Sequence, residues 1–122
     1  MLTGAHFLLH SKDPEADRAF FRDVLQFRCV DLGHNWLIFG LPPAELAIHP
    51  AADNFVQEHA GHSMMGAVLY LMCDNLQAMK KGLAEKGIKC SAESKWGTSV
   101  AVRLPSGGTI GLYQPTHPTA IG

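Results

Sequence analysis

In two short apolar stretches, histidine and glutamate side chains stand four positions apart. His6 and His10 lie in "AHFLLHS". Glu45 and His49 lie in "AELAIHP". Turn-forming residues bound both stretches, which predicts strands. Because side chains alternate between the two faces of a strand, each pair shares one face. Imidazole and carboxylate groups bind metals and move protons, so these four residues are candidates for a functional site.

Spacing limits which of these side chains can act together. At a rise of about 3.3 Å per residue, His10 lies about 13 Å along the strand from His6, too far to bind the same ion. Three roles are open to His6 and Glu45: they hold a metal, they contact a ligand without a metal, or they only pack. We expect His10 and His49 to line the same surface as His6 and Glu45 and to take part in ligand binding.

The composition excludes several classes of function. The 122 residues carry a formal net charge of −1, with 47% hydrophobic and 17% charged residues, as in an ordinary globular protein. The lack of a Lys/Arg cluster argues against nucleic acid and membrane partners. The start "MLTGAHFLLHSKD" has neither a basic region nor a long apolar run, so we expect no signal peptide. No stretch approaches the ~20 apolar residues of a membrane span.

The three cysteines, Cys29, Cys73 and Cys90, predict a reducing compartment. Their number is odd and none belongs to a CxxC pair, which favours free thiols in the cytoplasm. Packing as small apolar side chains is the expected role of all three. Cys73 also stands beside a predicted helix N-terminus, which is expected to lower its pKa.

Periodicity predicts a repeated unit of one helix and several strands. Helices are expected at residues 12–27 and 74–87, with Asp13 as the first cap and either Asp74 or Asn75 as the second. Strands are expected at residues 5–11, 27–32, 35–41, 44–50, 67–73, 88–94, 98–105 and 109–115. Asp13 and Asp74 are 61 positions apart, and so are Cys29 and Cys90. The sequence therefore contains two copies of a βαβββ module.

This duplication predicts an α+β fold in which two βαβββ modules form a cupped mixed sheet. We expect one domain over residues 3–116, with modules at 1–50 and 66–116, a linker at 51–65 and a tail at 117–122. Two half-sheets of this kind pair edge to edge and leave a concave face opposite their helices. The linker has no clean period, and its His59 and His62 suit either one helical turn or a lid.

Three stretches together with the duplication point to a known family: "HFLLHSKDPEADRAFFRDVLQF", "PAELAIHP" and "KWGTSVAVRLPSGGTIGLYQP". From Thr3 to Pro115 the chain resembles the vicinal oxygen chelate superfamily. That superfamily includes glyoxalase I, extradiol dioxygenases and the fosfomycin and bleomycin resistance proteins. The resemblance implies a glyoxalase/bleomycin-resistance-like scaffold, on which many different functions are found.

The resemblance also implies four metal-ligand positions, on the first and last strands of each module. They fall at His6, Glu45, Ala67 and Gly111 in this sequence. The first two match the family's ligands, whereas the last two have no side-chain donor. Two ligands bind a metal weakly, because affinity depends on their number and geometry. We therefore expect no cofactor; the alternative is a divalent ion, Zn, Ni, Mn or Fe, held by His6 and Glu45.

Further residues are expected near the concave face. Trp96 and Tyr113 suit either stacking on a planar ligand or packing. Arg103 suits either an anionic ligand or solvent. Trp36 and Phe39 are expected to fill the sheet interface. At Gly111 the missing side chain is expected to leave room for a ligand.

These observations predict a small-molecule-binding protein. It would bind an aromatic or amphipathic ligand in a sheet-lined cleft without a complete metal site. The alternative is a metal-dependent lyase, isomerase or dioxygenase that uses His6 and Glu45. A third possibility is an interaction module without chemistry. We expect a cytoplasmic homodimer, because members of this superfamily usually bury module edges against a second chain.

Overall fold

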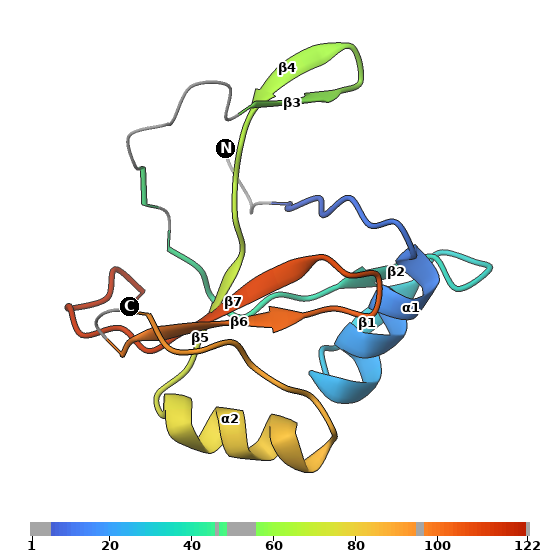
Figure 1. Cartoon of the computed structure of the whole chain (residues 1–122). Coiled ribbons are helices and arrows are strands. Elements are labelled where there is room, and N and C mark those ends of the chain that lie inside the picture. The colour runs from blue at the N-terminus through green and yellow to red at the C-terminus, as the bar shows by residue number, and fades with distance from the viewer. Residues whose placement is uncertain (1–5, 46, 49–55, 95–96, 122) are drawn as a thin grey trace. The chain divides into compact units, whose positions relative to one another are not determined.

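The computed structural model describes residues 6–45, 47–48, 56–94 and 97–121 (Figure 1). The chain divides into two compact units. Unit 1 contains residues 1–41 and 103–109, and unit 2 contains residues 42–102 and 110–122. Helices and strands occur in both units, so the chain is an α+β protein. No helix in these described ranges is long and apolar enough to cross a membrane.

Unit 1 begins with a helix that starts where the sequence predicts. The α-helix α1 (Pro14–Ala19) continues directly as a π-helical turn, η1 (Phe20–Val24). The Asp13 carboxylate caps α1 by accepting the Ala16 N–H at 3.2 Å. Pro14 occupies the first turn, where a missing backbone N–H has no cost. Local sequence therefore fixes the position of this helix.

A short hairpin completes the core of unit 1. Strands β1 (Cys29–Asp31) and β2 (Leu37–Phe39) pair antiparallel. The Phe21 ring lies 5.5 Å from that of Phe27 and 5.6 Å from that of Phe39. Phe39 therefore packs inside the unit, as expected. The expectation that Trp36 is interior is wrong, because this ring is exposed and lies 4.3 Å beneath the Arg18 guanidinium.

Asp17 is the only polar residue among those described that is classed as buried, with 7% of its surface exposed. Its carboxylate accepts the Ser11 hydroxyl at 2.6 Å. From the turn after strand β6 (Ser99–Arg103) it also accepts the Ser106 hydroxyl at 2.7 Å and the Ser106 N–H at 3.0 Å. The helical pattern alone favours a solvent-facing Asp17. Burial is tolerated because these three donors replace water.

Unit 2 contains a mixed sheet in which β7 lies between β5 and β6. The strands are β5 (Tyr70–Met72), β6 (Ser99–Arg103) and β7 (Thr109–Tyr113), and their helix is α2 (Leu76–Glu85). Arg103 and Thr109 themselves belong to unit 1. Strands β5 and β7 are parallel. Helix α2 lies along one side of this sheet (Figure 1). Its Leu76 and Leu83 are buried, as are Val100, Val102, Ile110 and Leu112.

The ends of α2 agree with the sequence. Of the two candidate caps, Asn75 is the one used, and its side-chain oxygen accepts the Ala78 N–H at 3.0 Å. Gly87 follows the helix with a φ of 78°. Glycine adopts this left-handed conformation without the steric cost that a Cβ brings, which ends the helix here.

Residues 56–65 form a hairpin, so the expectation of a helical turn in this segment is wrong. Strands β3 (Val56–His59) and β4 (His62–Met65) pair antiparallel, and His59 and His62 are opposite each other. Ala60 and Gly61 between them both have positive φ, which suits a tight two-residue turn. Every residue of both strands is exposed. The proposed module boundaries stay a prediction.

Several predicted strands do not form in the described residues. Segments 6–11, 44–45 and 47–48 contain no strand, and 88–94 contains only a single bridge between Cys90 and Val102. Beside that bridge, the Ser91 hydroxyl accepts the Ala101 N–H at 2.8 Å. Apolar patterning favours an extended chain, but a strand also needs a partner along its length.

Candidate functional site

Two tyrosines, Tyr70 and Tyr113, form an aromatic cluster on one face of the unit 2 sheet. Tyr70 on β5 is paired with Gly111 on β7, and Tyr113 follows two residues later. The two tyrosine rings meet edge to face, with centroids 6.3 Å apart and an interplanar angle of 73°. Half of Tyr70 is exposed, at 51%. Edge-to-face pairs of this kind are an ordinary stable arrangement of aromatic rings.

Gly111 allows the Tyr70 ring to lie where it does. A Cβ built at position 111 would overlap the Cδ1, Cε1 and Cγ atoms of Tyr70. The expectation that the missing side chain leaves room for a ligand is therefore wrong in this form, because the Tyr70 ring fills that room. The position that the resemblance assigns to a metal ligand carries an aromatic surface instead.

Glu45 lies next to this cluster and contacts the C-terminal tail. Its Oε2 accepts the Ala120 N–H at 2.8 Å. Its Oε1 lies 3.8 Å from Nε2 of His117. The His117 ring in turn stacks on Tyr113, with centroids 5.9 Å apart and an interplanar angle of 30°. The carboxylate, the imidazole and the phenol therefore form one continuous group within unit 2.

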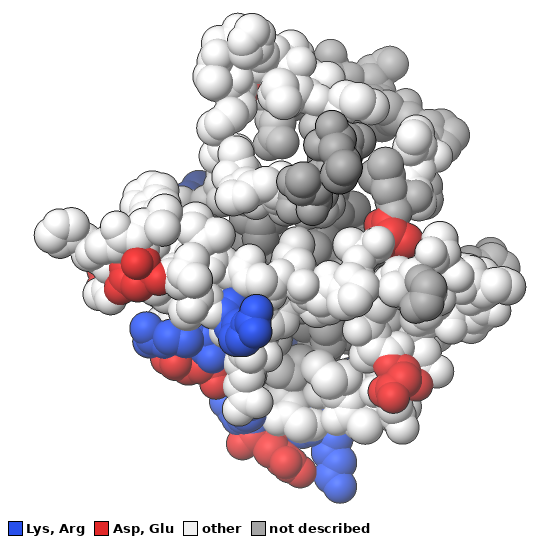
Figure 2. Space-filling view, turned by 180° about the vertical axis from the view of Figure 1, so that it is seen from behind, with Lys and Arg blue, Asp and Glu red and all other residues white. Residues whose placement is uncertain are grey.

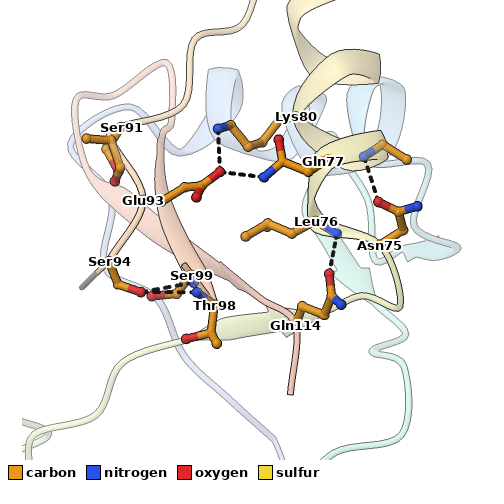
Figure 3. Close-up of polar contacts among 12 residues, drawn as sticks. Asn75, Leu76, Gln77, Lys80, Ser91, Glu93, Ser94, Thr98, Ser99 and Gln114 are labelled. Carbon is orange, nitrogen blue, oxygen red and sulfur yellow. Dashed lines mark hydrogen bonds and ion pairs between the residues drawn. The ribbon is translucent and has the colours of Figure 1, made fainter. Parts of the chain in front are cut away.

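Gln114 fixes the point where the tail leaves the sheet (Figure 3). Its side-chain Oε1 accepts the Leu76 N–H at 2.8 Å, at the start of α2. Its backbone N–H donates to the Thr98 carbonyl at 2.8 Å. Because the tail starts from an anchored residue, His117 and Ala120 are held within reach of Glu45.

The predicted site residues are distributed unevenly. Glu45 and Tyr113 are joined through His117 in unit 2. His6 and His10 lie in unit 1, exposed and outside any strand. Arg103 is exposed at the end of β6. His49 and Trp96 lie outside the described residues. The assignments of these seven residues to a ligand site stay predictions.

Two residues of this cluster were missed by sequence reasoning. Tyr70 has the aromatic type and the strand position of a surface residue, but only the β5–β7 register places it over Gly111. His117 lies in the segment "QPTHP", which is too short and proline-rich for periodicity to place. The two prolines that restrict the backbone beside His117 were the available signal.

The described residues do not fit a metal centre with three protein ligands. They contain no group of three or more His, Cys, Asp or Glu residues placed to hold an ion. Gly111 supplies no donor, and the Tyr70 ring occupies the space beside it. Both oxygens of Glu45 face the tail. We therefore derive no chemistry from a metal at Glu45.

The thiols of unit 2 differ from the expected pattern. Partial burial raises the pKa of Cys73 above its ordinary value, although a backbone hydrogen bond at Asn75 opposes the rise. Burial raises the pKa of Cys90 in the same way, with Lys80 opposing. The expectation of a lowered pKa at Cys73 is wrong, because loss of solvent outweighs the helix end.

The face of the molecule shown in Figure 2 carries charges of both signs side by side, with Lys and Arg side chains beside Asp and Glu side chains. One such group is on the α2 side of unit 2, where Glu93 accepts Gln77 and also pairs with Lys80 at 3.0 Å (Figure 3). These contacts lower the pKa of Glu93, with Gln77 the larger cause.

Comparison with solved structures defines the class of fold. The chain has the fold of the glyoxalase/bleomycin resistance protein/dioxygenase superfamily. A member from Sphaerobacter thermophilus matches over 93% of this chain and 98% of its own, with a TM-score of 0.51 and 15% identity. The predicted α+β, glyoxalase-like fold is therefore confirmed, and the resemblance is confirmed at the level of the fold.

Two particular structures match with higher TM-scores. Lactoylglutathione lyase from Agrobacterium tumefaciens gives a TM-score of 0.62 at 22% identity, covering 92% of both chains. TnmS3, an antibiotic binding protein from a Streptomyces species, gives 0.58 at 20% identity, covering 95% of this chain and 99% of its own. No protein-family profile matches the sequence, and no curated protein matches it as a relative.

Proposed function

We propose that this protein binds an aromatic or amphipathic small molecule on the Tyr70–Tyr113 face of the unit 2 sheet, without a complete metal site. One observation carries the proposal. At Gly111, where the family would have a metal ligand, an aromatic pair covers the sheet. Exposed aromatic rings on a rigid sheet stack on planar ligands with little loss of side-chain freedom.

The antibiotic-binding structure supports this choice. TnmS3 shares the fold over nearly the whole chain and is itself a binding protein. Half of Tyr70 is exposed, so a ligand has direct access to an aromatic ring. We also infer that the protein is cytoplasmic, because all three cysteines are free thiols, which suits a reducing compartment. We infer a homodimer as well, because large apolar side chains such as Ile48 and Met65 are exposed in unit 2.

A titration with 2-naphthol, a neutral planar aromatic probe, tests the proposal. We expect saturable binding in calorimetry, and Tyr113→Leu should weaken it about threefold to tenfold, the value of one stacking contact. Trp36→Leu removes an exposed ring from unit 1 and should leave the affinity unchanged. Equal affinities of wild type and Tyr113→Leu, or no binding to either, would refute the proposal.

Metal analysis separates this function from the metal-dependent alternative. We expect purified protein to contain less than one equivalent of zinc, nickel, manganese or iron. Stoichiometric metal that is lost in both His6→Ala and Glu45→Gln would replace the binding proposal with a metal-dependent lyase, isomerase or dioxygenase. Iron or zinc retained in both variants would have to be bound elsewhere.

A further inference from the structure

The contacts between the C-terminal tail and Glu45 resemble the contacts of a bound ligand. The tail presents a planar nitrogen-containing ring, His117, which lies against Tyr113 at 5.9 Å. It also presents an N–H donor, from Ala120, to the Glu45 carboxylate at 2.8 Å. One flat ring on an aromatic face and one N–H on a carboxylate are the two features by which a small heteroaromatic compound would be recognised.

In this arrangement the side chain of Glu45 is less exposed to solvent than that of His117, the tail residue that lies beside it. The Glu45 side chain is 19% exposed, whereas that of His117 is 48% exposed. Residues 114–121 form neither helix nor strand. Segments held by few buried contacts open at low cost, whereas Tyr113 below the tail is held in β7. Opening would begin after Gln114, which is fixed to Leu76 and Thr98.

We propose that Glu45 and Tyr113 form a recognition site for a planar, cationic nitrogen compound, and that His117 and Ala120 of the tail occupy this site until such a ligand displaces them. This inference rests on the proposed function and names its ligand class. The tail is an intramolecular competitor, and the ligand takes over its stacking contact and its hydrogen bond.

The charge of the ligand follows from the chemistry of Glu45. An ionised carboxylate only accepts hydrogen bonds, so its partners must donate. Donors that also carry positive charge form the stronger bonds, and two parallel N–H groups match its two oxygens. An amidine attached to a ring has this geometry. A ring bearing a carboxylate has the same shape but the opposite charge, and Glu45 would repel it.

Competition predicts that loosening the tail strengthens binding. The apparent dissociation constant equals the intrinsic one divided by the fraction of molecules whose site is open. Removing the His117 ring deletes one stacking contact, so the open fraction should rise about threefold to tenfold. Ala120→Pro deletes the N–H that Glu45 accepts, because proline has none, and should act in the same direction.

The experiment is a calorimetric titration of the full chain with benzamidine, and with benzoate as its anionic counterpart. We expect wild type to bind benzamidine at least tenfold more tightly than benzoate. His117→Ala and Ala120→Pro should each tighten benzamidine binding about threefold to tenfold. Glu45→Gln keeps an acceptor for the Ala120 N–H but removes the negative charge, so it should weaken benzamidine binding and remove the preference over benzoate. His62→Ala, on the exposed β4, is the matched control and should change nothing.

Specific outcomes would overturn the inference. Benzoate binding as tightly as benzamidine would remove the role of Glu45. Unchanged or weaker benzamidine binding in both tail variants would show that the tail does not compete. Circular dichroism of each variant excludes misfolding as the cause. If 2-naphthol binds in a Tyr113-dependent way while these results fail, the ligand class is wrong and the binding function stands; if 2-naphthol also fails, both are wrong.

Discussion

At position 111 the absence of a single methyl group determines where an aromatic ring can lie. The Tyr70 ring occupies the volume that a Cβ would need, and no positive φ is involved at this glycine. The constraint is therefore one of packing between two side chains on neighbouring strands. It can be tested by a double-mutant cycle, because each side chain can be removed separately.

Gly111→Ala should destabilise the protein by about 1–3 kcal/mol, the usual cost of overpacking, because the Tyr70 ring must rotate away. In a Tyr70→Ala background the same substitution should cost less than about 0.5 kcal/mol, since the obstructing ring is gone. Urea denaturation of the four proteins measures both values. An equal cost in the two backgrounds would mean that Tyr70 is not the obstruction.

The raised pKa values of Cys73 and Cys90 predict slow alkylation at neutral pH. A thiol reacts as its thiolate, and a raised pKa keeps the thiolate fraction small until the pH approaches that value. Between pH 7 and pH 9 the iodoacetamide rate at both sites should therefore rise with pH and stay below that of glutathione. Site-resolved mass spectrometry measures it. A rate at Cys73 above that of glutathione at pH 7 would contradict the prediction.

At the scale of elements, α1 is held by a contact that no helix propensity provides. The Asp17 carboxylate accepts donors from the segment before the helix and from the turn that follows β6. It thereby joins three separate parts of unit 1. Because these hydrogen bonds are part-buried, removing the carboxylate would leave the Ser11 and Ser106 donors without their protein acceptor.

Asp17→Ala should cost about 2–4 kcal/mol of unfolding free energy, because it removes the acceptor of three part-buried hydrogen bonds. Asp17→Asn retains one acceptor oxygen and should lose less. Asp23→Ala is the control: Asp23 lies in η1, is exposed, and pairs only with its exposed neighbour Arg22 in the contacts seen here, so no measurable change is expected. Chemical denaturation measures the free energy of unfolding of the three variants and of the wild type. Equal stability of Asp17→Ala and wild type would show that the buried cluster contributes nothing.

Elements with local signals were predictable from sequence, and those with distant partners were not. Caps at Asp13 and Asn75 depend on residues a few positions away, so both helix starts were found. Strands need a neighbour, which is why 5–11 and 44–50 looked like strands in sequence and form none in their described parts. Glu45 was predicted as a site residue from the resemblance, and Tyr113 from strand alternation beside Gly111. The His117 contact that joins them depends on the path of the tail, which no local pattern predicts.

At the scale of the whole molecule, hydrophobic side chains lie exposed in unit 2. Ile48 and Met65 are each 81% exposed, and Val68 is exposed as well. The β3–β4 hairpin has no buried residue, and a lone two-stranded hairpin is only marginally stable in water. A second copy of the chain that covers these residues would remove apolar surface from water.

We therefore expect sedimentation velocity to show a dimer at micromolar concentrations. Met65→Lys, which places a charge on the exposed hairpin, should shift the protein toward monomer, because burying an unpaired ammonium is costly. Glu85→Lys, at an exposed position of α2, changes charge away from the hairpin and should leave the dimer intact. A monomeric wild type, or identical behaviour of the two variants, would exclude the hairpin as the contact.

The bond between Asp17 and Ser106 also constrains how the protein is made. The two residues are 89 positions apart, so the ribosome must synthesise most of the chain before the first helix meets its last partner. Until then the emerging N-terminal segment exposes Phe20 and Phe21, two phenylalanines that the finished protein buries. Translation pausing near the C-terminus would prolong this exposed state, and nascent chains stalled before Ser106 should be bound by chaperones more strongly than released full-length chains.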